Sequence, residues 1–175
     1  MLLTVWLART FVGQAFYIPS ESMVPQLAVN DRVVVSKLAY DLHDPRRGDI
    51  VVFDAPTSAP PSSDRSWAPV RFLRNLVTPS AREYIKRVMA LPGERVEARG
   101  GRVLINGTPL VEPYLPPGTQ TADFAATVVP AGRLWVMGDN RPASQDSRSF
   151  GPIRRSTVVG RAIVRVWPVQ RFSFL

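Results

Sequence analysis

Hydrophobic and polar positions alternate over short stretches along most of this chain, and turn-forming residues separate the stretches. Prolines (17) and glycines (11) are scattered between them rather than gathered in repeats. Short β-branched runs bounded by such residues are typical of strands. The runs that we expect to be strands are Asp31–Leu38, Gly48–Asp54, Glu83–Leu91, Leu134–Met137 and Val158–Trp167. The pattern therefore predicts a mainly β fold, with helix only at the start of the chain.

We expect a single β domain over 19–175, and three other segments belong to it. Gly100-Gly101, flanked by Arg95–Val96 and Arg102–Ile105, is a strong β-hairpin signal. Residues 55–80 are rich in Pro and Ser and are expected to form a long surface insertion. Residues 106–131 carry several prolines and are expected to be a short irregular excursion.

The N-terminal segment is apolar up to Ala8 and is then interrupted by Arg9. A membrane-spanning helix needs about 20 apolar residues, so this stretch is too short to cross a bilayer by itself. Aromatic residues follow at Phe11, Phe16 and Tyr17, as in an interfacial belt. We expect residues 1–18 to be the outer end of a membrane helix whose beginning is missing, or an interfacial helix. A buried amphipathic helix is the alternative.

Composition narrows the chemistry that the chain can perform. It has no cysteine, which excludes disulfides, thiolate zinc sites and a cysteine nucleophile. Its one histidine, His43, lies in a polar turn-like stretch and is expected to be solvated. Lys37 and Lys86 are the only lysines; every other basic residue is arginine, which cannot be deprotonated in a protein. Any amine that acts as a base must therefore be one of these two lysines.

A Ser-Lys dyad is the nucleophile–base pair that this composition most readily permits, and Ser22 and Lys86 are candidates for it. Ser22 lies between Pro19 and Pro25, which stiffen its loop, although a serine in such a loop is most often only a turn residue. Lys86 is in the predicted strand 83–91, on the same face as Tyr84. If the amine is buried there, desolvation lowers its pKa, and a neutral amine can take a proton from a serine hydroxyl.

A dense polar turn at Gly138–Arg148 follows a predicted strand. Asp146 can pair there with Arg148 or Arg141 in a satisfied network, or the segment can be an ordinary Asx/Ser turn. A divalent-metal loop is disfavoured, because the segment has only two carboxylates and arginines stand among them. We expect no metal and no cofactor.

Several segments together resemble the type I signal peptidases, a family of Ser/Lys serine endopeptidases. The segments that carry the resemblance, all in the family's order, are Pro19–Pro25, Gly48–Phe53, Tyr84–Arg87, Leu91–Glu94 and Gly138–Gly151. The resemblance covers Thr10 to about Trp167. It implies an antiparallel-sheet catalytic domain with an N-terminal membrane-associated helix, and a second domain that is reduced here to the excursion at 106–131.

The resemblance also implies roles for individual residues. Ser22 would attack the scissile carbonyl, and Lys86 would take its proton and later protonate the leaving amine. The Ser22 backbone N–H and the Ser20 hydroxyl would form the oxyanion hole. Ser144 would orient the Lys86 amine, with Asp146 and Arg148 supporting that arrangement. The residues expected to line shallow pockets for small substrate side chains are Phe16, Ile18, Met23, Leu27, Tyr84 and Ile85.

The function implied is removal of signal peptides from secreted preproteins at the outer face of the bacterial plasma membrane. The net charge of +8 suits an anionic lipid surface. A self-cleaving regulator resembling the SOS-type repressor proteases shares the Ser/Lys chemistry, but the chain shows no helix-turn-helix pattern. A basic β module that binds nucleic acid is the non-enzymatic alternative. We expect no nucleic-acid partner, because basic and aromatic residues do not alternate on a strand face.

Overall fold

The structure is a computed structural model that describes residues 14–54, 56 and 83–175. Strands dominate these residues, as the alternating pattern predicts. The strands of the larger sheet are β1 Gln14–Tyr17, β2 Arg32–Ser36, β3 Ile50–Asp54, β4 Glu83–Ala90, β9 Arg133–Met137, β10 Ile153–Arg154, β11 Val158–Trp167 and β12 Ser173–Phe174. Those of the smaller sheet are β5 Arg95–Arg99, β6 Arg102–Ile105, β7 Thr108–Pro109 and β8 Phe124–Val128.

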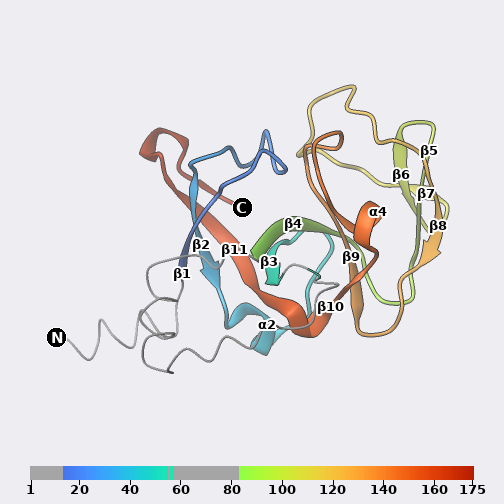
Figure 1. The fold of residues 1–175 in the computed structure, drawn as a ribbon, viewed down its shortest axis with the longest axis horizontal. Coiled ribbons are helices and arrows are strands. Elements are labelled where there is room, and N and C mark those ends of the chain that lie inside the picture. Colours follow the sequence, from blue (N-terminus) through green and yellow to red (C-terminus); the bar gives the residue numbers. More distant parts are fainter. Residues whose placement is uncertain (1–13, 55, 57–82) are drawn as a thin grey trace.

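Both sheets are antiparallel in every described strand pair. The larger has the order β1-β2-β11-β3-β4-β9-β10, with β12 beside β11, and the smaller has the order β7-β6-β5-β8. Figure 1 shows the smaller sheet set to one side of the larger one. The helical segments are single turns: α2 Ala39–Leu42, α4 Ser147–Phe150, and the 3₁₀ turns η1 Arg155–Thr157 and η2 Val169–Arg171. The expectation of helix only at the start is therefore wrong, although the mainly β prediction is confirmed.

The predicted N-terminal helix does not extend to residue 18. Gln14–Tyr17 forms β1 and pairs antiparallel with β2, with Phe16 opposite Val33. Phe16 is buried whereas Ala15 and Tyr17 are exposed, which is the two-residue period of a half-buried strand. The rest of the predicted helix, residues 1–13, lies outside the described residues. None of the helices in the described part is long and apolar enough to span a bilayer.

The smaller sheet is built around the predicted hairpin. β5 and β6 pair through Gly100 and Gly101, whose positive φ angles of 59° and 79° suit a tight two-residue turn. The excursion at 106–131 was expected to be irregular, but it contains β7 and β8, which flank the hairpin on its two sides. The predicted insertion at 55–80 lies outside the described residues except for position 56.

Strand β4 lies near the middle of the larger sheet and carries Lys86. It pairs with β3 along Glu83–Arg87 and with β9 only from Arg87 onward. Its C-terminal half is buried on both faces, because the hydrophobic cluster around Val51 and Phe53 covers one side and that around Met89 covers the other. A rigid central strand therefore positions the lysine, and the loop that follows β1 brings Ser22 to it.

Candidate active site

The loop between β1 and β2 holds Ser22 in a compact series of turns. The Val24 N–H donates to the carbonyl of Glu21 (3.0 Å), and the Leu27 N–H donates to the carbonyl of Met23 (2.8 Å). Met23 and Leu27 are fully buried in the hydrophobic cluster under the loop, so they anchor it from beneath. Ser22 itself is 6% exposed.

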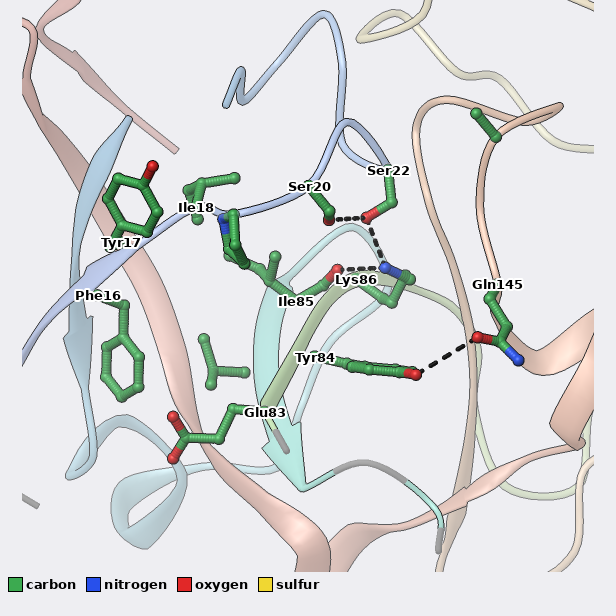
Figure 2. A pocket seen from close by; sticks show the side chains of 13 residues that line it. Phe16, Tyr17, Ile18, Ser20, Ser22, Glu83, Tyr84, Ile85, Lys86 and Gln145 are labelled. Carbon is green, nitrogen blue, oxygen red and sulfur yellow. Dashed lines mark hydrogen bonds between the residues drawn. The ribbon is translucent and has the colours of Figure 1, made fainter. Parts of the chain in front are cut away.

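Lys86 reaches Ser22 across 64 positions of sequence. Its Nζ lies 2.6 Å from Ser22 Oγ and 2.9 Å from the carbonyl oxygen of Ile85 (Figure 2). Ser20 Oγ lies 3.3 Å from Ser22 Oγ on the side away from the lysine. The predicted nucleophile and base are thus within direct hydrogen-bonding distance, and the second predicted hydroxyl is beside them.

Burial gives the Lys86 amine the ionisation that a general base needs. Desolvation lowers the pKa of Lys86 from 10.5 to about 8, against the carboxylates of Asp146 and Asp139, which raise it. The Tyr84 ring lies 5.5 Å from Nζ and covers one side of the amine. An appreciable fraction of the amine is therefore neutral near pH 7, unlike that of an exposed lysine.

The Gly138–Arg148 turn contains a network of charged side chains next to the Ser22–Lys86 pair. Asp146 accepts from the Gly138 N–H (2.9 Å) and from Nε and a terminal nitrogen of Arg148 (both 2.8 Å). Burial would raise the pKa of Asp146, but hydrogen bonds from Arg148, the Gly138 N–H and the Ser144 hydroxyl outweigh burial and lower that pKa. Asp139 forms a two-point ion pair with Arg87 of β4 (2.8 and 2.6 Å). Of the two partners expected for Asp146, the structure selects Arg148.

The predicted bond between Ser144 and the Lys86 amine is absent. Lys86 Nζ bonds to Ser22 and the Ile85 carbonyl, whereas the buried Ser144 hydroxyl lies on the Asp146 side of the turn and helps to lower the pKa of that carboxyl. The turn packs Ser144 closely against Gly138. A Cβ at Gly138 would lie 2.2 Å from Ser144 Oγ and 2.4 Å from the carbonyl oxygen of Ser22. The glycine thus permits the turn to approach the nucleophile.

An open cleft of about 520 Å³ leads to the dyad. Of the predicted pocket residues, Phe16, Ile18, Tyr84 and Ile85 line it, and Figure 2 shows the residues of β1 and β4 on its two sides. Met23 and Leu27 do not line it, because the turn after Ser22 directs both side chains into the core. The further lining residues are Tyr17, Pro19, Ser20, Ser22, Val52, Glu83, Lys86, Ala143 and Gln145.

Sequence reasoning missed several of these contributions. Val52 lines the cleft because the β3–β4 register places it opposite Ile85. Gln145 lies at the rim, where its side chain accepts from the Tyr84 hydroxyl (3.4 Å). Asn140 contacts the nucleophile loop through its own backbone and side chain. The position of Val52 follows from the pairing of two strands that are distant in sequence. No local sequence pattern indicates the contacts of Gln145 or Asn140.

The other candidate groups lie elsewhere or form no site. His43 lies in the segment after α2, where its ring contacts the carbonyl of Asp44, and it does not line the cleft. Among the residues that the structure describes, no three His, Cys, Asp or Glu side chains gather as a metal site would require.

Comparison with known proteins places these features in a family. Residues 1–167 match the family described as signal peptidase, peptidase S26. The chain is 48% identical over 170 residues to a signal peptidase I of Leptolyngbya laminosa, covering 95% of this chain and 75% of that protein. It is 39% identical to the signal peptidase I of Mycobacterium tuberculosis (94% and 68% covered) and 34% identical to that of Bacillus caldolyticus (95% and 86%).

Proposed function

The chain belongs to the signal peptidase family S26, whose type I members are serine endopeptidases that cleave signal peptides from preproteins, and from this premise we propose how it performs the cleavage. We propose that Ser22 is the nucleophile and Lys86 the general base. The observation that carries the proposal is the 2.6 Å approach of a buried amine to a buried serine hydroxyl at the end of an apolar cleft. Family membership sets aside the self-cleaving regulator and the nucleic-acid module.

The proposed reaction uses the lysine first as a base and then as an acid. Neutral Lys86 accepts the Ser22 hydroxyl proton as Oγ bonds to the scissile carbonyl carbon. The resulting ammonium gives that proton to the leaving amine as the peptide C–N bond breaks, which leaves an ester on Ser22. Lys86 then takes a proton from water, which attacks the ester, and Lys86 returns the proton to Ser22 Oγ as the signal peptide carboxylate departs.

The negative charge on the tetrahedral intermediate needs donors beside Ser22. The Ser22 backbone N–H and the Ser20 hydroxyl are the proposed pair. Ser20 Oγ is 3.3 Å from Ser22 Oγ and lines the cleft, so rotation of its hydroxyl can direct the hydrogen toward a bound carbonyl oxygen.

The preprotein is proposed to bind as an extended strand along β4. Within the described residues, Glu83–Lys86 pair with β3 on one edge only, since β9 joins the other edge from Arg87 onward. A peptide that adds to this open edge would form main-chain hydrogen bonds, and its alternate side chains would point into the cleft. The apolar lining by Phe16, Ile18 and Ile85 favours small, uncharged side chains before the cut.

We also propose that the catalytic domain works at the extracytoplasmic surface of the plasma membrane. Aromatic and aliphatic side chains are exposed around the β11–β12 turn: Trp167 (51%), Val169 (61%), Phe172 (57%) and Phe174 (80%). Such a patch on a chain of net charge +8 suits an anionic bilayer. Replacing Phe172 and Phe174 by Ser should weaken co-flotation with anionic vesicles; unchanged flotation would contradict this surface.

The proposed activity is tested by incubating the detergent-solubilised protein with a preprotein and mapping the new N-terminus. We expect one cut after a small residue at the end of the signal peptide. The matched control is the same preprotein with Trp at the position before the cut, which the cleft should reject. Equal cleavage of both preproteins would contradict the proposed binding mode.

A further inference from the structure

Asn140 holds both peptide groups that flank the nucleophile. Its side-chain amide Nδ2 donates to the carbonyl of Glu21 (3.1 Å), and its backbone N–H donates to the carbonyl of Ser22 (3.0 Å). These two carbonyls belong to the peptide groups immediately before and after the Ser22 Cα. One residue of the Gly138–Arg148 turn therefore fixes the orientation of the backbone on either side of the nucleophile.

The bond to Glu21 bears directly on the oxyanion hole. The Glu21 carbonyl and the Ser22 N–H are the two ends of one peptide group, and in a planar trans peptide they point in opposite directions. Holding the carbonyl against Asn140 therefore fixes the direction of the Ser22 N–H. That N–H is the backbone donor assigned above to the developing oxyanion. We propose that Asn140 is a positioning residue that orients this donor, an inference that rests on the proposed function of Ser22.

Asn140 is itself held firmly enough for this task. Its carbonyl accepts from the Ala143 N–H (3.1 Å), which closes a turn around it. The preceding residue, Asp139, is buried and paired with Arg87 of β4. The side chain is therefore carried on a turn that is tied to the same strand as Lys86. A donor positioned in advance in this way costs little reorganisation when charge develops in the transition state.

The nucleophile loop has other supports, so loss of the Asn140 side chain should leave the loop folded. At its far end, Arg165 of β11 donates to the carbonyl of Gln26, and Arg171 donates to that of Pro25 (3.2 Å). Both arginines also contact the buried carboxylate of Asp31 (3.5 and 3.1 Å). The Glu21 carbonyl also accepts from the Val24 N–H (3.0 Å), so loss of Asn140 Nδ2 removes one of two donors to this carbonyl and leaves the turn itself closed.

The test compares Asn140→Ala and Asn140→Asp with wild type. The Asp side chain keeps the size of Asn but, when ionised, offers only acceptors to the Glu21 carbonyl. If hydrogen-bond donation matters, Asn140→Asp should be at least as impaired as Asn140→Ala; if only packing matters, it should resemble wild type. For both variants we expect kcat to fall by about 10- to 100-fold, somewhat less than the loss of an oxyanion donor itself, with KM little changed.

A pair of inhibitors separates positioning from general damage to the site. A peptide aldehyde of the signal-peptide end forms a hemiacetal with Ser22 and places an oxyanion-like oxygen in the hole, whereas the corresponding peptide alcohol binds without a covalent bond. Both Asn140 variants should bind the aldehyde more weakly by about the factor lost in kcat, again about 10- to 100-fold, and bind the alcohol as wild type does. Equal weakening of both inhibitors would overturn the proposal in favour of a merely structural role.

Asn106→Ala supplies the matched control for a structural asparagine. Asn106 lies in the smaller sheet and has a positive φ of 52°. Its side-chain Oδ1 accepts a hydrogen bond from the Arg95 N–H (2.8 Å). Its replacement should lower Tm and leave kcat unchanged, the opposite of the result expected for Asn140. Wild-type kcat in both Asn140 variants, alongside an inactive Ser22→Ala, would overturn this inference alone. Cleavage by Ser22→Ala would instead overturn the proposed function on which it rests.

Discussion

The ionisation of Lys86 gives the most quantitative test of the proposed chemistry, and pH is the perturbation. Burial lowers the pKa of Lys86 from 10.5 to about 8. At pH 7 about a tenth of the amine is then neutral, compared with about 0.03% at the unperturbed pKa. Burial thus increases the active form of the base by about 300-fold at that pH, which corresponds to about 3 kcal/mol.

The assay is kcat/KM against pH on one peptide substrate, with the detergent and salt held constant. Because the neutral amine is the active form, the rate should rise tenfold per pH unit below the pKa and level off above a midpoint near 8. The Asp146 and Asp139 carboxylates raise the pKa, so added salt, if it screens them, should move the midpoint slightly downward. A profile that keeps rising to pH 10 would refute a desolvated lysine base.

Three further predictions concern the same cluster. Lys86→Met should be more stable than wild type at pH 6, by up to about 3 kcal/mol in urea unfolding. Between about pH 8, the folded pKa of Lys86, and pH 10.5, its unfolded value, only the unfolded chain holds the proton, so the stability of wild type should rise with pH. The stability difference between Lys86→Met and wild type should therefore shrink over this range. A difference that does not change with pH would contradict the lowered pKa. Ser20→Ala should lower kcat by about 10²- to 10³-fold with little change in KM, and a wild-type kcat would show that other donors form the hole. Gly138→Ala should nearly abolish cleavage, since its Cβ would lie 2.2 Å from Ser144 Oγ and 2.4 Å from the Ser22 carbonyl oxygen; near-normal activity with an unchanged Tm would show that the turn tolerates displacement.

Local patterns predicted the strands well where the hydrophobic residues of a strand form one continuous run in the sequence. Val158–Trp167 has the bounds that the sequence predicted, and the strand predicted at Glu83–Leu91 is observed at Glu83–Ala90. The hairpin at Gly100-Gly101 also followed from local chemistry, because a tight turn needs positive φ. The order of the motifs predicted Ser22 and Lys86 as partners, and the structure places their side chains in contact.

The misses concern interactions that no local pattern specifies. The sequence pattern predicts a helix that includes Gln14–Tyr17, whereas pairing with β2, a non-local contact, makes this segment a strand. Met23 and Leu27 are apolar, as residues that line a pocket often are, but the turn after Ser22 directs both side chains into the hydrophobic core. Ser144 lies in the expected motif and its orienting role stays a prediction, since Lys86 Nζ bonds to Ser22 and the Ile85 carbonyl in the structure. Asn140 acts through main-chain carbonyls, which every residue has, so its partners could not be recognised from sequence.

Single-turnover cleavage of one preprotein by wild type, Ser22→Ala and Lys86→Arg tests the central claim most directly. The arginine variant keeps a positive charge at this position but cannot become neutral, so it separates the need for a base from the need for a cation. Circular dichroism and Tm establish that each variant is folded. The Ser/Lys assignment predicts no cleavage by either folded variant at any pH from 6 to 10. Substantial turnover by folded Lys86→Arg or Ser22→Ala would contradict it.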